Sequence, residues 1–275
     1  MKKRFGLFIS VVIAVLFLGS ILLFSSLQFY LQRIGLLSSA NQFTKLLAAP
    51  PFIAAGIICS LVSFRYLPKL GAISKSHLLA ILLLPIVLQI TAIPLYNISL
   101  ELFPPNQLFF ELMKAFEPTG EFFDTIGAVL TIVVIGPIVE EYIFRGLMIE
   151  RPLKEGFNIH LIVLIQGLLF GLAHFNPWQF FYAVAFGILF GYLRIWSAGI
   201  LLTTILHILV NGITILSSYI EMPLIPESTN DGTPIIISQF WVVGSLLVGF
   251  ALTWFIYKNR LTDSNTNLTE MRPRL

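Results

Sequence analysis

The chain has 275 residues, of which 57% are apolar and only 11% are charged. A typical soluble domain has about 25% charged residues, and the mean hydropathy of this chain is +0.89. These values exclude a soluble globular protein and a disordered chain, and the net charge of +3 is too small to indicate a nucleic-acid partner. The sequence predicts an integral membrane protein whose surroundings are a lipid bilayer.

Uncharged apolar runs predict the helices in chain order. Most runs are close to the ~20 residues that cross a bilayer, and the long run over 156–193 is divided by Asn176-Pro177. The runs are continuously apolar, which is not typical of the alternating strands of a membrane barrel. The predicted fold class is therefore all-α, a polytopic bundle of about eight transmembrane helices at 5–31, 46–66, 77–99, 122–149, 158–175, 178–196, 199–220 and 235–257.

The first run follows Lys2-Lys3-Arg4 but is longer than the apolar core of a cleaved signal peptide, so we interpret it as a retained span. The resulting organisation has four parts. Residues 1–121 hold the N-terminal transmembrane helices and an outer loop, and 122–220 form a helical core that contains the polar residues described below. Residues 221–257 hold the last transmembrane helix with its preceding loop, and 258–275 form a polar tail.

The positive-inside rule orients this bundle. With the N-terminus in the cytoplasm, the opposite side holds only Arg33, Lys45 and Lys114, and Arg145 lies within a helix. A multi-pass protein of the cell membrane with both termini cytoplasmic is predicted. The cytoplasmic segments then hold thirteen basic residues: Lys2, Lys3, Arg4, Arg65, Lys69, Lys75, Arg151, Lys154, Arg194, Lys258, Arg260, Arg272 and Arg274.

One outer loop, residues 100–124, is rich in Glu and Phe. Its composition is compatible with a surface helix or a gate beside the membrane. A solvated loop with interfacial aromatic side chains is the simpler interpretation, and we expect that.

The helix predicted over 122–149 carries three charges in Glu140-Glu141-Tyr142-Ile143-Phe144-Arg145. A charge at membrane depth costs at least about 2.5–3.5 kcal/mol, so three together require partners and indicate a role. Glu141 and Arg145 are four residues apart and can pair on one helical face. We therefore expect Glu141 to be structural and Glu140 to remain available.

Three more polar residues lie in later helices at similar depth. The helix over 158–175 ends in Phe170-Gly171-Leu172-Ala173-His174, and His207 and Asn211 share one face of the helix over 199–220. A lone His in a span is more often an interhelical hydrogen-bond partner than a catalyst. A carboxylate, two imidazoles and an amide at overlapping depths instead supply a general base, a proton shuttle and oxyanion donors, which are the groups that add water to an amide. His77 and His160 are expected at the membrane interface.

Signatures of other enzymes are missing from the sequence. It contains no His-Glu-x-x-His zinc helix, no Gly-x-Ser-x-Gly elbow and no phosphate-binding or dinucleotide-binding glycine loop. The single cysteine, Cys59, lies inside an apolar run and excludes both an intrachain disulfide and a cysteine-rich metal cluster.

The ordered motifs Glu140-Glu141-x-x-x-Arg145, Phe170-x-x-x-His174 and His207-x-x-x-Asn211 resemble those of the CAAX protease and bacteriocin-processing (CPBP, or Abi) family of intramembrane proteases. The resemblance covers roughly residues 130–212. It implies an endopeptidase that cleaves a membrane-associated peptide or protein, or a prenylated C-terminus. Family members also include bacteriocin-immunity proteins.

The resemblance also implies roles for the individual residues. Glu140 and His174 would activate water, and His207 and Asn211 would hold the oxyanion. The cofactor stays open: either none is required, or Glu140, His174 and His207 bind a divalent metal such as zinc. Glu141, Arg145 and Phe170 would support the site.

Two other classes of function are weighed against a peptidase. A non-enzymatic membrane immunity or adaptor protein would use the same scaffold but tolerate the loss of Glu140. A proton-coupled transporter is compatible with Glu and His in spans, although no internal repeat is visible in the sequence.

Overall fold

The computed structural model describes residues 5–34, 49–63, 67–116, 122–217 and 232–261. Within these ranges every regular element is helical, which confirms the predicted all-α class. In chain order the elements are α1 (Gly6–Arg33), α2 (Ala49–Ser63), α3 (Lys75–Leu102), α4 (Gln107–Phe116), α5 (Phe122–Ala128), the π-helical segment η3 (Val129–Ile135), α6 (Gly136–Glu140), the π-helical segment η4 (Glu141–Leu147), α7 (Met148–Lys154), α8 (Ile159–Ala173), α9 (Pro177–Trp196), α10 (Leu201–Ser217) and α11 (Gln239–Lys258).

Five helical stretches in the described residues are long and apolar enough to cross a membrane. They establish a multi-pass membrane protein. Three shorter apolar helices, Ala49–Leu61, Ile159–Ala173 and Leu201–Ser217, lie between them along the chain. The five long stretches are Gly6–Phe24, Lys75–Leu102, Thr125–Lys154, Pro177–Trp196 and Gln239–Lys258. Eight crossings therefore remain a prediction.

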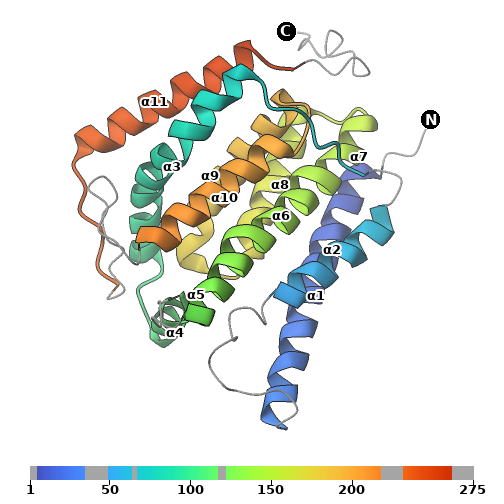
Figure 1. The fold of residues 1–275 in the computed structure, drawn as a ribbon, viewed down its shortest axis with the longest axis vertical. Coiled ribbons are helices and arrows are strands. Elements are labelled where there is room, and N and C mark those ends of the chain that lie inside the picture. Colours follow the sequence, from blue (N-terminus) through green and yellow to red (C-terminus); the bar gives the residue numbers. More distant parts are fainter. Residues whose placement is uncertain (1–4, 35–48, 64–66, 117–121, 218–231, 262–275) are drawn as a thin grey trace.

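The helices are arranged as two flanking pairs around a central group (Figure 1). Helices α1 and α2 pack together on one flank, and α3 and α11 pack together on the other. The continuous helix from α5 to α7 lies in the centre with α8, α9 and α10. One apolar cluster joins α1 and α2 to η4, around Phe17 and Phe144, and a second joins α3 and α11 to α9 and α10. The polar residues predicted to form the site lie between these two clusters.

The start of the last helix differs from prediction. The last helix begins at Gln239 and not at 235, because Ser238 is its N-cap and accepts a hydrogen bond from the N–H of Phe240. The preceding residues are extended, and the side chain of Asn97 in α3 makes two hydrogen bonds of 2.9 Å with the backbone of Ile235. Asn97 Nδ2 donates to the Ile235 carbonyl, and Asn97 Oδ1 accepts from the Ile235 N–H. Its side chain thereby replaces the hydrogen bonds that a helix would have made.

The described residues of the segment over 100–124 are also more helical than expected. Helix α3 continues to Leu102, and α4 is a short amphipathic helix rather than a solvated loop. Phe109 of α4 is completely buried and its ring packs edge-on against Trp178 of α9, at 5.0 Å between centroids. Burial of one aromatic side chain fixes the helix, so the surface-helix alternative is correct. Residues 117–121 lie outside the described ranges.

Both ends of the described chain lie at one end of the bundle. The Gly6 N–H donates to Glu155, which follows α7, at 2.7 Å, and the Leu261 N–H donates to the carbonyl of Trp196 at the end of α9, at 2.9 Å. This arrangement is compatible with the predicted location of both termini on one side of the membrane. Residues 262–275 of the predicted tail and 221–231 of the loop before the last helix lie outside the described ranges.

The two histidines expected at the interface have different environments. His160 is exposed and its Nδ1 lies 2.6 Å from the Tyr192 hydroxyl. His77 is instead completely buried, and its Nδ1 accepts a hydrogen bond from the Ser74 N–H at 3.3 Å. Its position at the first turn of α3 suggested the surface, but packing of the segment before α3 covers it.

A buried ion pair ties the ends of α7 and α9 together. Arg194 of α9 pairs with Glu150 of α7 and donates from Nε to the Arg145 carbonyl at 3.1 Å. The side chains of Arg194 and Glu150 are only 5% and 6% exposed. The side chain of Lys154, the second partner of Glu150, is 48% exposed. Arg194 therefore supports the helix that carries the candidate site.

The Arg194→Leu variant is expected to lose about 3–5 kcal/mol of stability, because it leaves the buried Glu150 carboxylate without its main partner. Lys154→Gln is the matched control: an exposed pair contributes about 0–1 kcal/mol. Thermal unfolding of both variants in the same detergent measures the difference. Equal decreases in Tm would show that Arg194 is not the partner that stabilises Glu150.

Candidate active site

The helix that carries the two glutamates contains two π-helical segments. The π-helical segments η3 and η4 flank the single α-helical turn of α6, and Glu140 and Glu141 lie at the junction of α6 with η4. π-Helical turns are often found at functional sites, where the wider turn redirects side chains. At this junction the two adjacent carboxylates differ in exposure: the Glu141 side chain is completely buried and that of Glu140 is 17% exposed.

Glu141 pairs with Arg145 as the four-residue spacing predicts. Arg145 Nη1 lies 2.9 Å from Glu141 Oε1, and both side chains are inaccessible to solvent. The angles of this contact are not those of a hydrogen bond, and within the described residues none of the guanidinium nitrogens has a hydrogen-bond acceptor. It lies instead over the rings of Phe170, at 4.0 Å, and Phe190, at 5.4 Å. Aromatic faces thus stabilise a cation that has one carboxylate partner.

His207 of α10 lies between the two glutamates. Its Nδ1 is 2.9 Å from Glu141 Oε1, and its Nε2 is 3.7 Å from Glu140 Oε2. A carboxylate can only accept a hydrogen bond, so Nδ1 carries a proton and donates it to Glu141. Glu141 is therefore more than the partner of Arg145, because it also orients the His207 ring toward Glu140.

His174 is the C-cap residue of α8, and its tautomer follows from one contact. Nδ1 lies 2.9 Å from the carbonyl of Phe170, one turn earlier. Since a carbonyl only accepts, Nδ1 is the donor and Nε2 of the neutral ring keeps its lone pair. Phe170 also lies edge-on to both imidazoles, at 4.8 Å from His174 and 5.9 Å from His207.

Asn211 lies one turn after His207 on the same face of α10, as predicted. Its Nδ2 donates to the carbonyl of Ile132, in η3, at 2.9 Å. The side chain is partly buried. The amide thereby joins α10 to the helix of the two glutamates.

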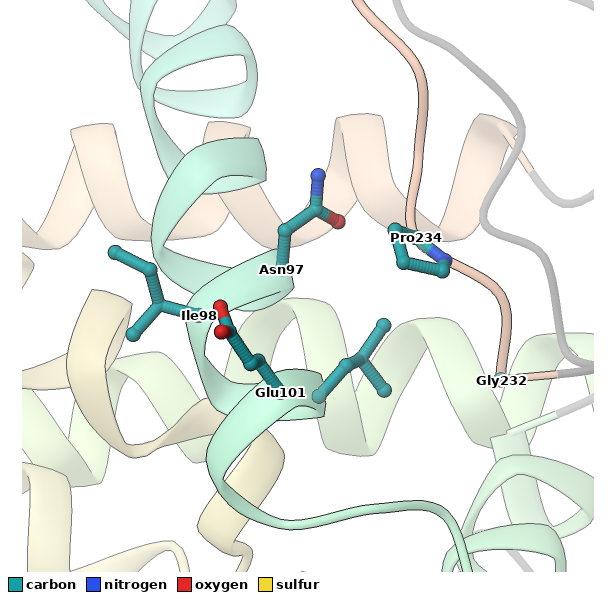
Figure 2. A pocket seen from close by; sticks show the side chains of 6 residues that line it. Asn97, Ile98, Glu101, Gly232 and Pro234 are labelled. Carbon is teal, nitrogen blue, oxygen red and sulfur yellow. The ribbon is translucent and has the colours of Figure 1, made fainter.

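The described cavities lie elsewhere in the molecule. One, of about 420 Å³, lies where the C-terminal part of α3 meets the extended segment before α11; Figure 2 shows Asn97, Ile98, Glu101, Gly232 and Pro234 around it. A second, of about 520 Å³, adjoins it between α3 and α11. We place the site at the polar cluster because neither cavity is lined by a group of complementary catalytic side chains.

Residues 122–213 match the model of one protein family, described as type II CAAX prenyl endopeptidase Rce1-like. The chain carries an Rce1-like domain. This match confirms the family that the three motifs indicated, and it contains every residue of the cluster described above. Neither a curated protein nor a solved structure matches this chain.

The arrangement within the Rce1-like domain bears on the choice of cofactor. No group of three His, Cys, Asp or Glu side chains in the described part of the chain is placed to hold a metal ion. His207 directs Nδ1 to Glu141, and its Nε2 opposes Glu140. The trio of Glu140, His174 and His207 is not such a group in the described residues, and we derive the chemistry from the side chains alone.

Sequence analysis missed three residues that support the site. Phe190 and Arg194 are on α9, and Gln89 of α3 donates from Nε2 to the Val210 carbonyl, at 2.7 Å, and to the Thr214 hydroxyl, at 2.8 Å. A lone Gln in an uncharged run was a usable signal, because a buried amide in a membrane requires a partner. Phe190 carried no signal, since it is one of 25 Phe residues in the chain.

Proposed function

We propose that this chain is an endopeptidase of the cell membrane that hydrolyses a peptide bond with water activated by Glu140 and His174. The observation that carries the proposal is the position of His207, whose two nitrogens face a buried and a partly exposed glutamate. This geometry supplies one accessible base beside one oriented donor, which amide hydrolysis requires. The Rce1-like match over the same residues supports the peptidase class.

The charges of the cluster balance only with a shared proton. Glu140 and Glu141 carry two negative charges when ionised, and Arg145 carries one positive charge. A proton on His207 Nε2, opposite Glu140, makes the four side chains neutral together. Neutrality matters because an uncompensated charge at membrane depth costs several kcal/mol. A protonated His207 can donate from Nε2 to a substrate oxygen while Nδ1 stays on Glu141.

The proposed reaction uses these groups in sequence. The oxygen of water bonds to the carbonyl carbon of the substrate, and its proton passes to Glu140, with the Nε2 lone pair of His174 as a second acceptor. His207 and Asn211 donate to the oxygen that becomes negative. The C–N bond then breaks, and the proton held by Glu140 goes to the leaving amine nitrogen.

The proposed substrate is a membrane-associated peptide or protein, with a prenylated C-terminus as the first class to test. The site is built from helices that are apolar enough to lie in a bilayer. A substrate must therefore bring its scissile bond to the membrane, and a prenyl group does so. The matching family is described as a type II CAAX prenyl endopeptidase. We further propose that both termini face the cytoplasm, where such C-termini are exposed.

The test is cleavage by the purified protein in liposomes. We expect wild-type protein to cleave a peptide with a farnesylated C-terminal cysteine, and the non-prenylated peptide of the same sequence to be cleaved at least about tenfold more slowly, since burial of the prenyl chain raises its local concentration. Mass spectrometry identifies the products. Equal rates for both peptides would overturn the prenyl proposal, and no cleavage of any membrane-anchored peptide by folded protein would overturn the peptidase.

A further inference from the structure

The contact between Asn211 and Ile132 depends on an unusual gap in the helix of the two glutamates. In an α-helix the Ile132 carbonyl accepts from the N–H of residue 136, and in a π-helix from that of residue 137. The Gly136 N–H donates instead to Thr131, and residue 137 is proline, which has no N–H. Ile132 is thus left without a helical donor in either register.

Asn211 supplies the missing donor. Its Nδ2 lies 2.9 Å from the Ile132 carbonyl. An amide nitrogen carries two hydrogens, so one N–H is held by Ile132 and the other stays available to a second acceptor. Glycine at position 136 allows this close approach of the backbone, because a Cβ there would lie 3.0 Å from the Thr131 carbonyl oxygen.

We propose that Pro137 is a positioning residue for the active site. By leaving the Ile132 carbonyl unpaired, it fixes the Asn211 amide, so that the second N–H is held ready for the oxyanion beside His207. This inference rests on the proposed peptidase function for its kinetic consequence. Its structural consequence, an energetic link between positions 137 and 211, does not depend on any activity.

Replacing Pro137 with alanine restores an N–H to the helix. In a π register Ala at this position donates to Ile132, and in an α register Gly136 does so; in both cases the Ile132 carbonyl gains a helical donor. The Ile132 carbonyl then no longer depends on Asn211 for a hydrogen bond, and the Asn211 amide is held less firmly. We expect Pro137→Ala to fold, since alanine favours a helix more than proline does, and to lower kcat roughly tenfold while KM changes less than about twofold.

A double-mutant cycle in matched detergent tests the link. In the wild-type background Asn211→Ala leaves Ile132 unpaired and is expected to lower Tm by roughly 2–10 °C. In the Pro137→Ala background the same substitution should lower Tm by less than half as much, because the carbonyl already has a donor. Asn97→Ala is the matched control, since Asn97 also donates to a backbone carbonyl, that of Ile235, at 2.9 Å. Its effect should be the same in both backgrounds.

The outcomes separate this proposal from the proposed function. Equal Tm losses for Asn211→Ala in both backgrounds would overturn the positioning role, whether or not the protein cleaves peptides. A coupled Tm with an unchanged kcat in Pro137→Ala would overturn its link to catalysis. Pro94→Ala, within α3, controls for the general effect of replacing a helix proline and should leave kcat unchanged. If wild-type protein cleaves nothing, the peptidase is rejected while the Tm cycle still tests the contact.

Discussion

Glu140→Gln is expected to lower kcat by about 10²–10⁴-fold while the protein keeps its fold and its Tm within a few degrees. Glutamine has nearly the same size and can hydrogen-bond to His207, but it cannot accept the proton of water. Arg145 keeps Glu141 as its carboxylate partner, and with a neutral His207 the remaining charges still balance, so no buried cation is left unpaired. Cleavage of the farnesylated peptide in liposomes, with folded protein quantified for each variant, measures the effect.

The control for Glu140 is another glutamate of the same chain. Glu101 is exposed and lies beside the cavity at the far end of α3, so Glu101→Gln should leave kcat unchanged. A folded Glu140→Gln protein with near wild-type cleavage would contradict the assignment of the base. That result would also favour a membrane adaptor or immunity protein, which needs the scaffold but not the carboxylate.

Glu141→Gln is expected to act mainly on stability. Both charged partners of its Oε1, Arg145 Nη1 and His207 Nδ1, lie at 2.9 Å. Removing the negative charge strands a fully buried guanidinium, which typically costs about 3–5 kcal/mol. Thermal unfolding should therefore show a lower Tm, in contrast to Glu140→Gln. The folded fraction should also be less active, because a protonated His207 loses its anionic partner.

Arg145→Gln completes this comparison. Alone it should cost about as much as Glu141→Gln, since it leaves a buried carboxylate with His207 as its remaining charged partner. The double variant should cost less than the sum of the two single variants, because neither charge is then stranded. Additive losses would show that the 2.9 Å ion pair contributes nothing to stability. A stable but inactive Glu141→Gln protein would exchange the roles of the two glutamates.

Helix positions were predictable from the sequence because the bilayer imposes a length on uncharged runs. Local signals located the ends: Asn176-Pro177 was expected to divide one run, and the structure places Asn176 as the N-cap and Pro177 as the first residue of α9. The pairing of Glu141 with Arg145 was predictable for the same reason, since it depends on spacing within one helix.

Contacts between helices were not predictable in this way. The His207–Glu141 hydrogen bond and the placement of Arg145 over the rings of Phe170 and Phe190 depend on how four helices pack. The π-helical register was not predicted either, including the hydrogen bond from the Gly136 N–H to the Thr131 carbonyl. A sequence could suggest which polar residues converge, but not that Glu141 would orient His207 as well as neutralise Arg145.

The most direct test of water activation by Glu140 is a single-turnover cleavage of the farnesylated peptide in ¹⁸O-labelled water, with enzyme in excess. We predict that the newly formed carboxylate carries one ¹⁸O atom in the first turnover, because water attacks the substrate carbonyl directly, and that Glu140→Gln forms no product on that timescale. An unlabelled carboxylate in the first turnover would contradict the account, since its oxygen would then come from an enzyme side chain through a covalent intermediate.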